Sequence, residues 1–193
     1  MGGSAHVFGG RCLHELDTER LRLRAFAVEH LDALHALWTD PDVRRYLWDD
    51  RVISRERAAK VIADSEHNFE ERGFGFWAML LRAEGDALIG FCGYRLFEET
   101  GEPELLYGIL PRFWGKGLVS EAAHAVIRDG FERCGFQRII AATDTPNQSS
   151  VKVMQRLGML FLKRGKFHGL DTVFFELSPA DYADHLELGA RST

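Results

Sequence analysis

The first clear pattern in the chain is a strict alternation of apolar and charged residues. Leu21, Leu23 and Ala25 are separated by Arg22 and Arg24, and this period of two predicts a strand with one face in solvent. Farther along, apolar residues recur either at this period or at the three-to-four-residue spacing of helices. The chain therefore switches repeatedly between short strands and helices.

These periods, together with the breaks at proline and glycine, give an order of elements. The sequence predicts a strand at 21–25, helices at 28–38 and after Ser54, a hairpin of strands at 74–81 and 87–97, a strand at 104–110, a helix at 118–134, a strand at 139–142, a helix at 147–157, and closing strands around Phe161 and at 173–177. Pro41 is expected to mark the end of the first helical region. The order indicates a mixed α/β (α+β) sheet with helices on both sides, not a doubly wound parallel sheet.

A glycine turn between the strand at 104–110 and the next helix carries the first chemical signal. Arg112 is followed by Gly115 and Gly117 in the segment PRFWGKGLVS. The first N–H groups of a helix have no partner inside it, and glycine lets a ligand approach the backbone, so such a turn can hold a phosphate. Arg112 and Lys116 add positive charge. Taken alone, the same pattern is also compatible with an ordinary turn.

Two other phosphate-binding motifs fit this turn poorly. The Walker motif needs Ser or Thr after the lysine, but Lys116 is followed by Gly117. The dinucleotide fingerprint needs a third glycine where Ser120 stands, and it normally lies near the start of a βαβ unit. These residues therefore disfavour both a nucleoside triphosphatase and a nicotinamide-binding domain.

Length and charge narrow the class of protein further. The 193 residues fit one domain at 11–193, preceded by a Gly-rich tail at 1–10 that we expect to be disordered or added during cloning. A net charge of −5 disfavours nucleic-acid binding and mildly favours cationic substrates. No apolar run is long enough for a membrane span and no secretory leader is evident, so we expect a cytoplasmic protein without a membrane partner.

Neither a disulfide framework nor a metal site is predicted. Cys12, Cys92 and Cys134 have no CxxC spacing, and none of the eight histidines forms an HExxH motif. The cysteines are expected to be core residues or idle thiols.

Three features occur together in a way that resembles the GNAT superfamily of acyl-CoA-dependent N-acyltransferases. They are the order of elements, the segment from Arg112 to Gly117, and Asn147-x-x-Ser150 followed by RLGM. The segments ELDTERLRLRAF, LWTDPDVRRYL and TPNQSSVKVMQRLGM resemble its RimJ/RimL-type branch. The resemblance covers residues 16–182 and implies a mostly antiparallel sheet of about seven strands with about four helices.

The resemblance also implies where acetyl-CoA is bound. It places the pyrophosphate on the backbone from Arg112 to Leu118, and the pantetheine arm along a strand that parts from its neighbour. The residues that it assigns to the cofactor are Ile109, Leu110, Arg112, Gly115, Lys116, Gly117, Leu118 and Asn147. For Asn147, a purely structural role as a helix N-cap is a comparably good interpretation.

Two catalytic candidates follow from the same resemblance and from the chemistry. An amine attacks a thioester only as the free base, so a proton acceptor is required, and Glu104 stands where the branch carries a carboxylate. Glu99 and Glu102 are rival carboxylates in a predicted loop. Ser150 stands where the branch often has a hydroxyl near the thioester sulfur, although it also suits a first helical turn.

The sequence thus predicts an acetyl-CoA-dependent N-acetyltransferase that works by direct transfer in a ternary complex, without a metal. The acceptor is a primary amine, and a protein N-terminus and a small molecule are both open. A CoA-binding sensor without transferase activity is the alternative from a different class, and a homodimer is one open state of assembly.

Overall fold

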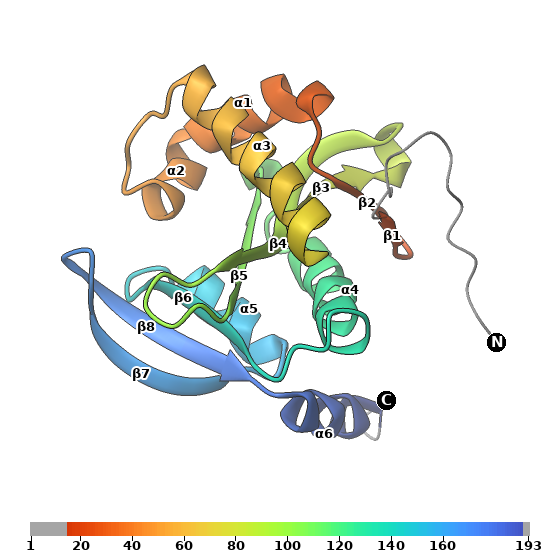
Figure 1. Cartoon of the computed structure of the whole chain (residues 1–193), viewed down its shortest axis with the longest axis vertical. Coiled ribbons are helices and arrows are strands. Elements are labelled where there is room, and N and C mark those ends of the chain that lie inside the picture. The colour runs from red at the N-terminus through yellow and green to blue at the C-terminus, as the bar shows by residue number, and fades with distance from the viewer. Residues whose placement is uncertain (1–14, 191–193) are drawn as a thin grey trace.

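Eight strands form one continuous sheet in the computed structural model of the chain, which describes residues 15–190. The strands lie in the order β1-β2-β3-β4-β5-β6-β8-β7 (Figure 1). Their bounds are β1 Glu15–Asp17, β2 Leu21–Ala25, β3 Phe76–Leu81, β4 Ala87–Leu96, β5 Pro103–Ile109, β6 Ile139–Asp144, β7 Leu160–Phe167 and β8 Leu170–Leu177. All neighbouring pairs are antiparallel except β5 and β6. The predicted mixed, mostly antiparallel sheet is confirmed.

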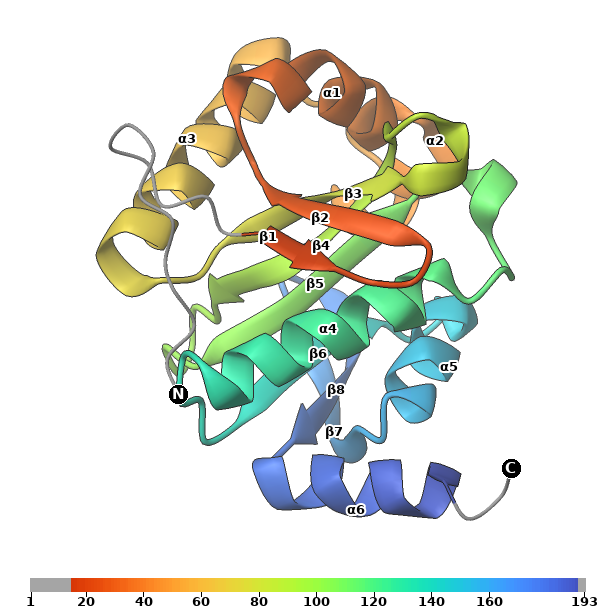
Figure 2. The same ribbon diagram turned by 90° about the vertical axis from the view of Figure 1, so that its right-hand side faces the viewer.

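Helices cover both faces of this sheet. Their bounds are α1 Leu31–Thr39, α2 Pro41–Leu47, α3 Arg55–Arg72, α4 Leu118–Glu132, α5 Gln148–Arg156 and α6 Pro179–Ala190. Helices α1 to α3 lie over one face of β2 to β5, and α4 lies across the other (Figure 2). The expected N-terminal tail and Cys12 lie outside the described residues.

The alternation of strand side chains explains why the core has two layers. In β3, Trp77 and Met79 point into the cluster that contains the apolar face of α4. Ala78, between them, points into the cluster formed with α1 to α3. All three side chains are fully buried, so β3 reads as a continuous apolar run in sequence.

The parallel pair β5 and β6 touches at a single point. Only Glu104 and Ile140 are in register, whereas β6 pairs along its whole length with β8. Beyond this point the two strands part, as the resemblance implied. The sheet therefore contains a gap on the carboxyl side of β5.

Several predicted boundaries are confirmed by backbone contacts. The hydroxyl of Ser54 accepts a hydrogen bond from Arg57 N–H at 3.2 Å and caps α3. Gly158 follows α5 with a φ of 78°, the left-handed conformation that glycine adopts most readily. The turn between β3 and β4 falls at Arg82–Glu84.

The sequence prediction missed three elements, β1, α2 and α6. Pro41 was expected to mark a break, but it is the first residue of α2, where its missing N–H would have no helical partner anyway. The carboxylate of Asp40 caps this helix by accepting from Asp42 and Val43 N–H. Pro179 begins α6 in the same way, after Ser178. A proline preceded by a capping residue was thus a start signal in both places.

None of the helices described in residues 15–190 is long and apolar enough to cross a membrane.

The close pairing of β4 with β5 predicts a strong effect of a methyl group at Gly90. A Cβ there would lie 2.4 Å from the carbonyl oxygen of Gly108. We expect Gly90→Ala to lower the free energy of unfolding by about 1–3 kcal/mol in urea denaturation, because backbone must move to admit the methyl. Gly165→Ala is the matched control, since a Cβ at Gly165 meets nothing within 4 Å. Equal stability of both variants would contradict this account of the β4–β5 contact.

Candidate functional site

A cavity of about 970 Å³ opens where β5 and β6 part. Its walls come from α2 and the loop after it, β5, the glycine turn, the start of α4, the end of β6, α5 and the β7–β8 hairpin. These segments are far apart in the sequence, and the gap in the sheet brings them together. The cavity is large enough for an extended ligand.

The glycine turn forms one end of this cavity. Gly115 and Gly117 have φ values of 73° and 74°, so both positions require the left-handed conformation that L-residues rarely adopt. Gly117 is the N-cap of α4 and supplies no side chain. Its carbonyl accepts the first hydrogen bond of the helix, from Glu121 N–H at 3.0 Å. The N–H groups of residues 118–120 precede that first bond and face the end of the helix where an anion is favoured.

The two basic residues of the turn, unlike its glycines, lie outside the cavity wall. Arg112 and Lys116 place their cationic groups over the ring of Phe113, at 4.7 and 5.1 Å from its centre. Gly115, Gly117 and Leu118 line the cavity, whereas Arg112 and Lys116 do not. Their side chains are exposed and flank the turn from outside.

The backbone of β5 presents one edge to β4 and the other to the gap. Leu110 N–H donates to the Ile89 carbonyl at 2.9 Å, so it is turned toward β4 and does not face the gap. N–H groups alternate in direction along a strand, so those of Ile109 and Tyr107 point toward the gap. The Ile109 carbonyl already accepts from Trp114 Nε1 at 2.9 Å.

Glu104 lies at the point where the two strands still touch. It is 3% exposed and lines the cavity, and its Oε2 accepts from Arg95 Nε at 2.6 Å. Burial raises the pKa of Glu104, while the charge and hydrogen bond of Arg95 oppose this rise without cancelling it. Glu104 is therefore a buried carboxylate that accepts a proton more readily than an exposed one.

The rival carboxylates lie apart from this position. Glu102 pairs with Arg138 at 3.3 Å and Glu99 pairs with Lys163 at 3.5 Å. Neither glutamate lines the cavity, whereas Glu98 does and pairs with His168.

Asn147 and Ser150 meet at the start of α5. Asn147 Oδ1 accepts from Ser150 N–H at 3.2 Å, so Asn147 caps the helix, and its Nδ2 donates to Thr143 Oγ1 at 3.0 Å. The Ser150 hydroxyl lies 2.9 Å from Tyr107 Oη. Both Asn147 and Ser150 line the cavity, so the capping role and a position in the cavity wall occur together.

Sequence reasoning did not single out two of the polar residues at the cavity, Tyr107 and Arg95. Burial raises the pKa of Tyr107, which keeps its hydroxyl protonated and able to donate. Tyr107 lies 43 residues before Ser150 in the sequence, and only the fold brings the two together. Arg95 is paired with Glu104 through the β4–β5 register, which no local pattern reveals.

Two acidic side chains of the cavity wall, Asp49 and Asp144, influence each other. Burial raises the pKa of Asp144, and the nearby charge of Asp49 adds to the effect. Asp50, the neighbour of Asp49, is paired with Arg44 at 3.0 Å. The same part of the wall also carries Arg45, Arg51 and Arg57, so both signs of charge line it.

The two cysteines within residues 15–190 do not line the cavity. Cys92 is buried and Cys134 is half-buried, and burial raises the pKa of both thiols. Within residues 15–190, no group of three or more His, Cys, Asp or Glu side chains is arranged to hold a metal ion.

Comparison with known proteins places this geometry in context. Residues 20–160 match the model of the acetyltransferase (GNAT) domain. The N-acetyltransferase p20 of Bacillus licheniformis is 30% identical over 178 residues, which cover 89% of this chain and 99% of p20.

Solved structures have the same fold at low sequence identity. A GNAT-family acetyltransferase from Bordetella pertussis superposes with a TM-score of 0.76 at 20% identity, over 86% of this chain and 99% of that one. RimL, a ribosomal L7/L12 α-N-protein acetyltransferase in complex with coenzyme A, superposes with a TM-score of 0.73 at 19% identity, over 86% and 98%.

The cap of α5 predicts how substitutions at Asn147 affect stability. Asn147→Ala removes the acceptor for Ser150 N–H and should lower the free energy of unfolding by about 1 kcal/mol. Asn147→Asp keeps that acceptor and loses only the donor to Thr143, so it should retain most of the stability. Urea denaturation of both variants measures the difference, and equal losses would show that the cap is not the stabilising contact.

Proposed function

This chain belongs to the GNAT acetyltransferase family, and on this premise we propose that it transfers the acetyl group of acetyl-CoA directly to a primary amine. The observation that carries the proposal is the gap between β5 and β6. It joins the glycine turn at one end to the buried carboxylate of Glu104 at the other. A cofactor arm and an acceptor can therefore meet beside β5.

Acetyl-CoA fits the backbone of this cavity. The N–H groups after Gly117 would take the pyrophosphate, since the two left-handed glycines leave them open. The amides of the pantetheine arm would pair with the N–H and C=O groups that β5 turns toward the gap. Asn147 would lie beside the arm while its Oδ1 caps α5. Arg112 and Lys116 would add only a screened attraction from outside the cavity.

The transfer needs one proton acceptor and two hydrogen-bond donors. Glu104, directly or through a water molecule, takes the proton that the amine nitrogen loses as it bonds to the thioester carbon. Ile109 N–H, which faces the gap, is the proposed donor to the developing oxyanion, because Leu110 N–H is already used by Ile89. The C–S bond breaks, and Ser150 donates to the departing thiolate.

The Tyr107 hydroxyl supports the role proposed for Ser150. Tyr107 can donate either to Ser150 Oγ, at 2.9 Å, or to the Ser150 carbonyl, at 3.2 Å. When Tyr107 donates to Oγ, the proton of the Ser150 hydroxyl is free to point at the sulfur. The high pKa of Tyr107 keeps this donor in place across the working range.

For the acceptor we propose an N-terminal α-amine, in line with the RimJ/RimL-type branch. An α-amino group has a pKa near 8, so a larger fraction is unprotonated near neutral pH than for a lysine side chain. The RimL structure of the same fold is that of an α-N-protein acetyltransferase. Asp49 and Asp144 would favour an acceptor that carries positive charge.

The direct test is to follow thiol release from acetyl-CoA with a panel of amines. The panel contains peptides with free and blocked N-termini, polyamines, free amino acids and aminoglycosides. Faster release with a free peptide N-terminus than with any other member supports the proposed acceptor. Faster release with a small amine would contradict an N-terminal acceptor and indicate a small-molecule acetyltransferase. CoA binding without thiol release in the presence of any amine would favour a sensor.

Removal of the proposed base should affect the rate and not cofactor binding. We expect Glu104→Gln to lower kcat/KM about 100-fold near neutral pH, on the scale of lost general-base catalysis. The loss should shrink at alkaline pH, where more of the amine is unprotonated. The dissociation constant for CoA, measured by calorimetry, should stay unchanged. An unaffected rate would remove Glu104 from the mechanism.

Arg95 supplies a signed prediction for the same group. Arg95 opposes the burial that raises the pKa of Glu104, so Arg95→Met should raise this pKa further. A base works only when it is deprotonated. As the pH is lowered, activity should therefore begin to fall at a higher pH than in the wild type, so the acid limb of the kcat/KM profile should shift to higher pH. Arg138→Met breaks the nearby pairs with Glu102 and Glu176 instead, and should leave the limb in place.

Ser150→Ala tests the donor to the departing thiolate. We expect kcat to fall about 10- to 100-fold, as for the loss of one hydrogen bond made in the transition state. Tyr107→Phe keeps the ring and removes only the hydroxyl that orients Ser150, so its effect should be smaller. If Ser150→Ala changes neither kcat nor the affinity for CoA, Ser150 is not the donor to the thiolate and has only a structural role in the first turn of α5.

A further inference from the structure

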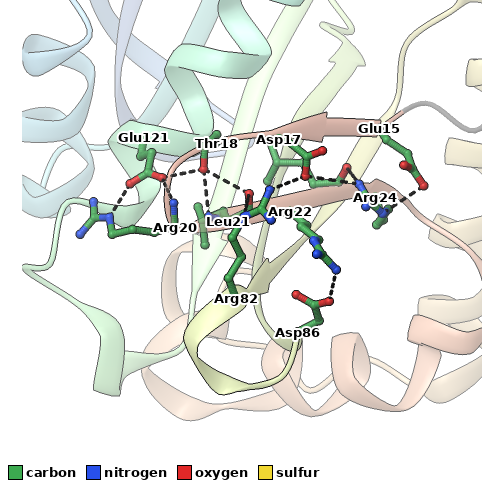
Figure 3. Close-up of polar contacts among 11 residues, drawn as sticks. Glu15, Asp17, Thr18, Arg20, Leu21, Arg22, Arg24, Arg82, Asp86 and Glu121 are labelled. Carbon is green, nitrogen blue, oxygen red and sulfur yellow. Dashed lines mark hydrogen bonds and ion pairs between the residues drawn. The ribbon is translucent and has the colours of Figure 1, made fainter.

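The first turn of α4 is held from a hairpin about a hundred residues earlier in the chain. Glu121 Oε1 accepts from Thr18 Oγ1 at 2.6 Å and from Arg20 N–H at 2.8 Å. Its Oε2 accepts from Arg20 Nε at 2.5 Å (Figure 3). Both carboxylate oxygens are thus bound by the turn that links β1 and β2.

The same arginine also reaches the glycine turn. Arg20 Nη1 donates to the Lys116 carbonyl at 2.9 Å. Its Nη2 would lie 3.7 Å from a Cβ built on Gly117, so the guanidinium lies directly against the turn. A turn with two left-handed glycines has much conformational freedom, and contacts from outside must fix it. Arg20 provides such a contact at both ends of the Lys116–Glu121 segment.

Charge gives Arg20 a second effect. Burial alone would raise the pKa of Glu121, but the hydrogen bonds from Thr18 and Arg20 outweigh it and hold the pKa below its usual range. Glu121 is therefore an anion in the first helical turn, next to the N–H groups proposed for the pyrophosphate. Without Arg20, this anion would repel the phosphates.

We infer that Arg20 and Glu121 are positioning residues for the pyrophosphate of acetyl-CoA. Glu121 anchors Arg20, and Arg20 fixes the Gly115–Gly117 turn and neutralises the charge of Glu121. The inference rests on the proposed function, because it takes the glycine turn as the phosphate site. It adds the β1–β2 hairpin, which lies outside the cavity walls, to the parts of the chain that determine cofactor affinity.

The first test compares two acetyl donors with the full-length protein. Arg20→Met should raise the KM for acetyl-CoA and the Kd for CoA about 10-fold or more, while kcat stays within about twofold. The KM for S-acetyl-pantetheine, which has no pyrophosphate, should not change. Arg20→Lys should recover part of the affinity, because it restores the charge but cannot make both contacts.

The second test separates charge from a merely structural role. The double variant Arg20→Met with Glu121→Gln should bind CoA more tightly than Arg20→Met alone, because the unpaired anion is gone. If the pair serves only to hold the hairpin on α4, the double variant should bind CoA no better than the single one. Calorimetry on the purified proteins measures both.

Arg22 provides the matched control on the same hairpin. It pairs with Asp86 at 2.5 Å, on the side away from α4 (Figure 3). Arg22→Met should therefore leave the Kd for CoA unchanged. Should Arg20→Met fail to fold, Arg20→Lys and Glu121→Gln are measured in the same way.

Gly117→Glu distinguishes failure of this inference from failure of the proposed phosphate site. If Gly117→Glu abolishes CoA binding but Arg20→Met leaves the KM for acetyl-CoA within twofold, the positioning role is wrong and the phosphate site stands. An equal rise of KM for acetyl-CoA and S-acetyl-pantetheine also overturns the inference. If Gly117→Glu leaves CoA affinity unchanged, the phosphate site itself is wrong and the inference falls with it.

Discussion

The separation of β5 from β6 is the constraint on which the rest of the site depends. Each backbone N–H or C=O group left unpaired inside a fold costs about 1–3 kcal/mol, so a gap within a sheet needs support on both sides. β5 is paired along its length with β4, and β6 is paired along its length with β8. These two ladders hold the strands apart after Glu104 and Ile140. A ligand that supplies amide groups to the gap would satisfy the backbone that the sheet leaves free.

The same contact point explains the state of Glu104. Because β5 and β6 still touch there, the carboxylate is buried, and burial favours its neutral form. Arg95, opposite in the β4–β5 register, favours the charged form. The guanidinium is itself partly exposed, so its effect is weakened by solvent and the pKa stays raised. Burial and Arg95 thus act on the pKa of Glu104 in opposite directions, and burial has the larger effect.

Local signals in the sequence predicted most of the fold and the turn. Gly115 and Gly117 were identified because a phosphate turn needs residues without a Cβ, and both have positive φ. The position of the Arg112 side chain outside the cavity was not predictable, because it depends on how the folded turn stacks Arg112 on Phe113. The α2 helix was missed because Pro41 was interpreted as a break.

Contacts between distant segments were beyond local patterns altogether. Glu121 contacts Thr18 and Arg20 from about a hundred residues away, and Ser150 contacts Tyr107 from 43 residues away. Contacts at such separations produce no periodic pattern in the sequence. They arise from the order of strands in the sheet and from the packing of α4 and α5 against it. The Leu110 N–H is a further case, because the register of β5 turns it toward β4, where it donates to the Ile89 carbonyl.

The geometry of β5 also separates Glu104 from Tyr107, the hydrogen-bond partner of Ser150. Glu104 and Tyr107 are an odd number of residues apart, so their side chains point to opposite faces of the sheet. Leu106 packs with α1 to α3 on the face of Glu104, whereas Tyr107 packs with the core under α4. An amine that approaches from the α1–α3 side would thus lose its proton on one face, and the thiolate would leave on the other. Since the wall on the amine side includes α2, changes there would alter the acceptor without disturbing the cofactor.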